Sequence, residues 1–191
     1  MSKSKKNTID PEEIIENYGA DAVRLFMLSD SPPEKDVQWS EQGIIACYKF
    51  IQKLWNLHEK IKIKLNKTEK LQQNFDEISK FTNKLINKIN TNLEKFHNNV
   101  IVANFYETYN FLIKEIEKPI NKKNLIKNYT KILKLMSPIL PHFTSECLEE
   151  LKCDNKLDWP VTDKKVSTVK NYKIIVQING KKRNIINTSL N

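Results

Sequence analysis

Glycine, cysteine and arginine are all scarce in this chain of 191 residues, which holds only three glycines and three cysteines. Long hydrophobic runs are absent too, since no apolar stretch approaches the roughly 18 to 20 residues that span a bilayer. The N-terminus also lacks the apolar stretch of a signal peptide. The sequence therefore predicts a soluble protein without membrane contact, and we expect it in the cytoplasm.

The three cysteines are Cys47, Cys147 and Cys153. Their number is odd, and no two of them have the two-residue spacing of a zinc knuckle or a redox motif. We find no set of metal ligands elsewhere in the sequence, so we predict no metal site. We expect the thiols to be reduced and mostly buried, as is usual in the cytoplasm.

Basic residues are abundant, but almost all of them are lysines. The formal net charge is +9, and Arg24 and Arg183 are the only arginines among 32 basic residues. A basic surface gains from counterion release on a phosphate backbone, which favours a nucleic acid as partner. Base edges are read best by the planar fork of arginine, so we expect contacts with phosphates. A solvated lysine surface that only reflects codon composition is the alternative.

The clearest helix start lies at residues 10–13, Asp-Pro-Glu-Glu. An aspartate N-cap, a proline at the first helical position and acids over the positive end of the dipole favour a helix that runs to Tyr18. Gly19 is expected to end it, and residues 20–29 form a second short helix. The pair has the shape of a helix-turn-helix, but its four acidic side chains argue against DNA recognition.

Apolar residues then recur at three- and four-residue spacing along four stretches, the first of which is capped by Ser40. Such spacing is typical of amphipathic helices, and helices joined by short connections pack as an antiparallel bundle. Two prolines interrupt the pattern before a last short helix over residues 143–151. The expected inward-facing residues are Ile44, Tyr48, Ile51, Trp55 and His58; Ile78, Phe81, Leu85, Ile89, Leu93 and Phe96; Val102, Tyr106, Tyr109, Ile113 and Ile116; Leu125, Tyr129, Ile132 and Met136; and Phe143, Cys147, Leu148 and Leu151.

Several aromatic side chains have two interpretations, as core residues or as stacking platforms for bases. Trp55, Tyr48 and Tyr106 lie on the expected apolar stripes, and we therefore predict that they belong to the core. Trp39 follows two prolines and is expected to pack its loop onto the bundle. His142 is expected to be a hydrogen-bonded histidine at a helix start.

The period of the sequence changes after residue 160. β-Branched residues flank the Asn-Gly pair at residues 179–180, which is the strongest short signal for a hairpin with a type I′ turn. Two strands alone bury too little surface to be stable. The hairpin is therefore expected to pack on the bundle or to open a further domain.

Five stretches of the chain together carry a resemblance to one family. Residues 1–4 (MSKS) look like the last four letters of the Lys-Met-Ser-Lys-Ser signature of class I aminoacyl-tRNA synthetases, and residues 10–26 (DPEEIIENYGADAVRLF) resemble its continuation. Residues 31–44 and 174–186 resemble the leucyl branch, of the bacterial type. Residues 135–151 are similar to the proline-histidine helix that closes the bundle. The valyl and isoleucyl branches are the alternatives within the family.

The resemblance implies ATP-dependent activation of an amino acid, with magnesium accompanying ATP in the intact enzyme. The signature loop stabilises negative charge on the departing pyrophosphate. Lys3 is accordingly the expected catalytic residue, and Met1, Ser2, Lys3 and Ser4 are the expected ATP-binding residues. Two features depart from the family: the first signature lysine would precede Met1, and Lys6 replaces the usual glycine. We expect Met1 to be an internal methionine of a longer chain.

By this resemblance the chain has three parts. Residues 1–39 form the remnant of the signature loop and a short helical connection, residues 40–160 form the tRNA-binding bundle, and residues 161–191 begin a C-terminal domain with its hairpin. The expected fold class is mainly α, an antiparallel bundle of the anticodon-binding type followed by a β-hairpin. The sequence has no Gly-rich strand-to-helix turn and no room for an editing domain. This segment alone is therefore expected to be inactive and to bind no cofactor.

Leucine tRNA is the partner that the resemblance implies, with leucine and ATP bound by the rest of a monomeric enzyme. Leucyl enzymes depend little on anticodon bases, so the bundle is expected to hold the tRNA backbone. The candidate contacts are Lys49 and Lys53, four residues apart on a polar face, and Lys181, Lys182 and Arg183 after the hairpin turn. Alternatives of another class are a free-standing basic helical protein that binds RNA or acts as a chaperone, and an interaction scaffold.

Overall fold

The structure is a computed structural model, and it describes residues 9–29, 38–66, 77–153, 158–163, 171–178 and 181–189. Within these ranges the chain forms seven helices and one two-stranded sheet. The elements are α1 (Pro11–Tyr18), α2 (Ala20–Ser29), α3 (Glu41–Asn66), α4 (Glu77–Glu94), α5 (Asn98–Glu115), α6 (Lys122–Met136), α7 (Pro141–Glu150), β1 (Asn171–Ile178) and β2 (Lys181–Ser189). The mainly helical class with a terminal hairpin is confirmed. No helix in these ranges is long and apolar enough to cross a membrane.

The two N-terminal helices have the bounds that their capping residues predict. The Asp10 side chain accepts a hydrogen bond from the Glu12 N–H at 3.0 Å, and Pro11 opens α1. Gly19 follows α1 with a φ of +82°, and its N–H donates to the carbonyl of Ile15 at 2.8 Å. This positive φ favours glycine, because side chains with a Cβ rarely adopt it.

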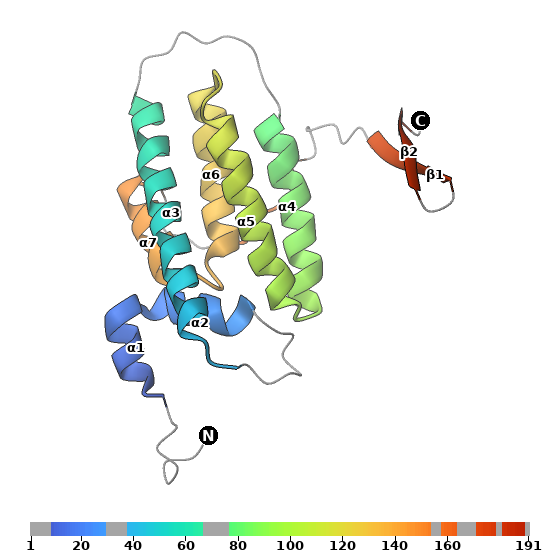
Figure 1. The fold of residues 1–191 in the computed structure, drawn as a ribbon. Helices are drawn as coiled ribbons and strands as arrows, with labels where there is room; N and C mark the ends of the chain where they lie inside the picture. The colour runs from blue at the N-terminus through green and yellow to red at the C-terminus, as the bar shows by residue number, and fades with distance from the viewer. Residues whose placement is uncertain are drawn as a thin grey trace.

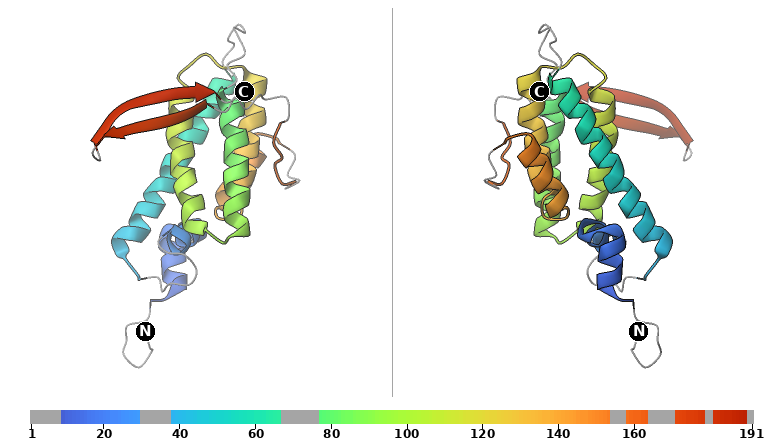
Figure 2. Two further views of the ribbon diagram at one scale, coloured as in Figure 1. Left: turned by 90° about the vertical axis from the view of Figure 1, so that its right-hand side faces the viewer. Right: turned by 90° about the vertical axis from the view of Figure 1, so that its left-hand side faces the viewer.

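Helices α3, α4, α5 and α6 stand side by side, with α7 along one flank and α1 and α2 at one end (Figure 1). The side views show the same end covered by the two short helices (Figure 2). Helix α2 packs against α3, α5 and α7. Its approach to α3 is close, because a Cβ at Gly43 would lie 2.6 Å from Cε2 of Phe26. The N-terminal segment is thus packed directly on the bundle.

The buried stripe of α3 is offset from the predicted one. Its buried residues are Ile44, Cys47, Phe50, Leu54, Leu57, His58 and Ile61. Trp55 packs at the edge of the core, where its ring meets Phe143 edge-on at 5.2 Å. The core prediction for Tyr48 is wrong, because this side chain is 36% exposed. Cys47 and Phe50 take the inward positions, whereas the Tyr48 ring lies at the rim of the core and meets Tyr18 edge-on at 5.8 Å.

The other helices also contain both confirmed and wrong core predictions. All four predicted residues of α6 are buried, from Leu125 to Met136. On α5 the buried ring is Phe105, and the core prediction for Tyr106 is wrong, since Tyr106 is 39% exposed. Phe96 is also no core residue: it is 69% exposed and follows α4 with a φ of 55°.

Polar side chains hold residues 158–163 on the bundle. The Asn83 side chain donates to the Asp163 carbonyl and accepts from the Asp163 N–H, both at 2.9 Å. The indole Nε1–H of Trp159 donates to Asn90 Oδ1 at 2.8 Å. Both asparagines belong to α4, so this helix holds residues 158–163 in place.

Strands β1 and β2 pair antiparallel, with Ile174 opposite Ile186 and Ile175 opposite Ile185. The predicted hairpin is therefore confirmed, although its turn at residues 179–180 lies outside the described residues. Ile175 and Ile186 are exposed, and the hairpin stands to one side of the helices (Figure 1).

Candidate nucleic-acid interface

Asp21 of α2 caps the N-terminus of α7 from outside that helix. Its Oδ2 accepts from the Phe143 N–H at 2.7 Å, and its Oδ1 lies 2.9 Å from His142 Nδ1 and 3.4 Å from the His142 N–H. Leu140, at the N-cap position of α7, offers no side-chain cap. A carboxylate there satisfies unpaired N–H groups and faces the positive end of the helix dipole. The predicted hydrogen-bonded histidine at a helix start is confirmed.

Arg24, one turn further along α2, binds the connection between α6 and α7. Its Nε donates to the carbonyl of Ile139 at 3.1 Å, and its Nη2 donates to the carbonyl of Pro138 at 2.6 Å. Asp21 thus binds the start of α7, and Arg24 of the same helix binds the connection that leads into it. We call this set the α2–α7 corner; it consists of Asp21, Arg24, Pro138, Ile139, His142 and Phe143.

Sequence reasoning did not find this corner. Both of its halves lie in stretches that carry the family resemblance, but no spacing rule connects side chains more than 110 residues apart. One signal was available, because Asp21 and Arg24 are the only charged residues of α2. Charged residues on an otherwise apolar helix point to specific partners.

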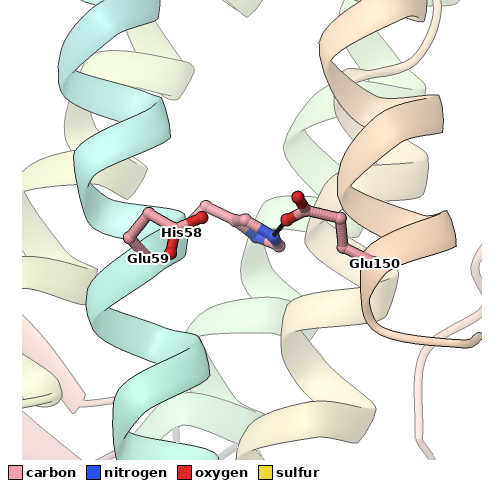
Figure 3. Close-up of side chains that lie close together, drawn as sticks. All are labelled: His58, Glu59 and Glu150. Carbon is pink, nitrogen blue, oxygen red and sulfur yellow. Dashed lines mark hydrogen bonds and ion pairs between the residues drawn. The ribbon is translucent and has the colours of Figure 1, made fainter.

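A second polar cluster joins α3 to α7. The buried His58 places Nε2 2.9 Å from Glu150 Oε2 (Figure 3). Its Nδ1 lies 3.0 Å from the Tyr129 hydroxyl. Lys62 Nζ donates to both Glu59 Oε1 and Glu150 Oε2 at 2.9 Å. The cluster therefore ties one long helix to the short helix that closes the bundle.

The same cluster offers three ligand atoms, from His58, Glu59 and Glu150, that lie within 4.8 Å of one another. The Lys62 ammonium already forms ion pairs with both carboxylates and would repel a cation. We interpret the cluster as a structural tie. That the chain binds no metal stays a prediction.

Burial lowers the pKa of His58 below its ordinary value of 6.5, although the hydrogen bond to Glu150 acts in the opposite direction. The distance to Glu150 is that of an ion pair, but burial favours the neutral ring. We therefore assign the Nε2–H as donor to Glu150 and Nδ1 as acceptor from the Tyr129 hydroxyl. Hydrogen bonds from Lys62 and His58 lower the pKa of Glu150.

The structure places some of the predicted contact residues and leaves others undescribed. Lys49 and Lys53 are exposed on α3, and Arg183 is exposed on β2. The side chains of Lys181 and Lys182, at the start of β2, are not described. The predicted ATP-binding residues Met1, Ser2, Lys3 and Ser4 all lie outside the described residues.

Some exposed lysines of the bundle have no side-chain partner among the described residues, and three of them lie on α3. Within the described ranges, Lys49, Lys53 and Lys60 form neither an ion pair nor a hydrogen bond, and we call them the α3 lysine face. By contrast, Lys88 Nζ lies 2.7 Å from Glu107 Oε2. Three positive charges on one helix are thus available to a polyanion.

A hollow of about 350 Å³ lies between α3 and α5 near the same face. Its lining combines aliphatic side chains with two lysines and one glutamate: Ile63, Ile113, Ile116, Lys60, Lys64 and Glu117. The seam between these helices therefore has apolar surface beside positive charge.

Two families of known proteins match the chain. The family described as "Anticodon-binding domain of tRNA ligase" matches residues 76–191, which is more than half of the chain. The family described as "tRNA synthetases class I (I, L, M and V)" matches residues 1–40.

Curated relatives carry the name leucine–tRNA ligase. That of Bartonella tribocorum is 37% identical over 195 residues, and that of Wolbachia pipientis wMel is 36% identical over 193 residues. These alignments cover 96% and 100% of the chain but only 22% and 23% of the relatives. A crystal structure of the ternary complex of Agrobacterium radiobacter K84 LeuRS, tRNA and LeuAMS has the same fold, with a TM-score of 0.83 at 24% identity over the whole chain and 26% of that chain. The chain belongs to the anticodon-binding domain family of tRNA ligases.

Proposed function

We propose that this chain is the tRNA-binding segment of an enzyme that activates leucine with ATP and transfers it to leucine tRNA. The match of the whole chain to leucine–tRNA ligases carries this proposal. The valyl and isoleucyl alternatives have less support, because the relatives named above are leucine–tRNA ligases. A free-standing RNA-binding protein or a scaffold does not account for the match of residues 1–40 to class I synthetases.

Residues 1–39 serve the chemistry in this proposal, residues 40–160 hold tRNA, and residues 161–191 begin a C-terminal domain. The Lys3 ammonium stabilises the phosphates of ATP as pyrophosphate leaves, while Ser2 and Ser4 shape the loop and Met1 belongs to the same ATP-binding segment. Magnesium accompanies ATP in the intact enzyme. We propose a monomeric enzyme of the cytoplasm.

The bundle holds tRNA by its backbone, in this proposal through Lys49 and Lys53, and the hairpin adds Lys181, Lys182 and Arg183. Lysine ammoniums are point charges that suit phosphates, whereas reading base edges favours the fork of arginine. The exposed and internally unpaired state of the two α3 lysines supports this assignment. The affinity for tRNA is therefore expected to depend little on the anticodon sequence.

A binding titration of the purified chain tests this function. The ligands are leucine tRNA, the same tRNA with an altered anticodon, and an unrelated RNA hairpin. We expect the two tRNAs to bind within about twofold of each other, because phosphate contacts carry no sequence information. A tenfold or larger loss caused by the altered anticodon alone would show that the bundle reads bases. Absence of binding to all three RNAs would leave the lysines as a solvated surface.

Catalysis gives a second test. The chain alone is expected to show no leucine-dependent exchange of pyrophosphate into ATP, and exchange above a blank without protein would contradict this. In the intact enzyme, Lys3→Ala is expected to lower the rate of leucine activation and leave tRNA affinity unchanged. Equal losses of both would assign the loop another role.

A further inference from the structure

Tyr106 forms an aromatic surface that the backbone contacts above do not use. Its ring on α5 stacks on the Phe50 ring of α3, with ring centroids 3.8 Å apart and an interplanar angle of 24°. Phe50 is 3% exposed and also meets Tyr109 edge-on at 5.9 Å. The buried ring therefore holds one face of Tyr106 in place, while Tyr106 itself is 39% exposed.

Lysines without an internal partner lie on the same helix as Phe50. Lys53 follows Phe50 by three residues, so the two are neighbours on the surface of α3. Lys60 lies two turns further along the same helix and borders the hollow between α3 and α5. Glu107, the acid beside Tyr106, is bound to Lys88 of α4 at 2.7 Å.

The Tyr106 ring stays neutral near phosphates, since burial raises the pKa of its phenol above the ordinary value of 10. A fixed aromatic face next to lysines is the arrangement with which proteins bind unpaired bases of RNA. RNA is the favoured partner, because Lys49, Lys53 and Lys60 give this face of α3 positive charge without an internal partner.

We propose that Tyr106 is a stacking platform for one unpaired nucleobase of bound RNA, with Lys53 on an adjoining phosphate. The proposal rests on the RNA-binding function proposed above and adds a contact with a base face to the contacts with the backbone. Stacking involves no base edge, so the site accepts any base and agrees with the scarcity of arginine.

Two RNA hairpins test the site with the purified chain: one fully paired in its stem, and the same hairpin with a single unpaired adenosine in the stem. Fluorescence anisotropy gives both affinities. We expect the hairpin with the unpaired base to bind about 5- to 150-fold more tightly, which is the range of one base–aromatic stack. Tyr106→Leu is expected to abolish this preference, because leucine covers Phe50 but has no π-face. Tyr106→Phe is expected to keep it.

Tyr48→Leu is the matched control, since Tyr48 is 36% exposed on α3 but meets Tyr18 edge-on instead of stacking. This variant is expected to keep the preference. If Tyr106→Leu retains the preference, or if the wild type binds both hairpins equally, the stacking site is wrong while backbone binding stands. Absence of binding to either hairpin would overturn both proposals. Circular dichroism of each variant confirms that the helices are intact.

Discussion

The α2–α7 corner and the α3 lysine face differ in where their charges find partners. At the corner, Asp21 and Arg24 both bind backbone groups of the chain itself. On the α3 lysine face, the described residues provide no partner for Lys49, Lys53 or Lys60. Charges with internal hydrogen bonds fix the arrangement of helices, whereas solvated charges add little stability and remain available to a polyanion. The two regions are therefore expected to respond differently to substitution.

The largest effect is expected from Asp21→Ala, which leaves the first N–H groups of α7 without an acceptor. The expected loss in the free energy of unfolding is about 2 to 3 kcal/mol, measured by urea denaturation. Glu16→Ala is the control, because this exposed acid of α1 lies beyond the first turn and has no such role, and a change within about 0.5 kcal/mol is expected. If the two variants lose equal stability, the corner does not hold α7.

An intermediate effect on the free energy of unfolding is expected when the pH is lowered. Because the pKa of His58 is lowered in the folded state, the unfolded state binds more protons below pH 6.5. The stability contribution of His58 is therefore complete above pH 6.5 and lost as the pH falls through the folded pKa. The titration of His58 changes the free energy of unfolding by at most about 1.4 kcal/mol per pH unit.

Replacing the titrating ring checks this assignment. His58→Gln should flatten the curve of unfolding free energy against pH in that window, whereas the exposed His97→Gln should leave its shape unchanged. A wild-type curve that is already flat between pH 6.5 and 5 would show that His58 is not kept neutral by burial.

The smallest effect on stability is expected from Lys49→Ala combined with Lys53→Ala. Both side chains are exposed and without an internal partner, so the free energy of unfolding should change by no more than about 0.5 kcal/mol. Urea denaturation of this double variant, run beside Asp21→Ala, compares the two regions directly. A loss as large as that of Asp21→Ala would mean that the lysines stabilise the fold and would remove the contrast.

Local signals predicted the helix ends well. The Asp10 cap, the proline that follows it and Gly19 determine the bounds of α1 through contacts within a few residues. Which side chains of the long helices face the core was harder to predict. On α3 both Tyr48 and Phe50 suit a core by composition, and the choice between them depends on neighbours such as Tyr106 that come from a distant helix.

The candidate site was predictable only in part. Exposure of Lys49 and Lys53 followed from helical spacing, whereas the lack of internal partners required the positions of all neighbouring acids. The stacked pair of Phe50 and Tyr106 was out of reach for the same reason as the α2–α7 corner: its two members are joined by packing and not by sequence spacing.

The salt dependence of leucine tRNA binding tests the central claim most directly. If all five proposed side chains contact phosphates, the logarithm of the association constant should fall against the logarithm of salt concentration with a slope of about −3.5 to −4.5. The double variant Lys49→Ala and Lys53→Ala should flatten that slope by about 1.4 to 1.8. Replacing Lys181, Lys182 and Arg183 by alanine should flatten it by roughly 2 to 3. An affinity independent of salt, or a slope unchanged in both variants, would contradict a tRNA grip through these phosphate contacts.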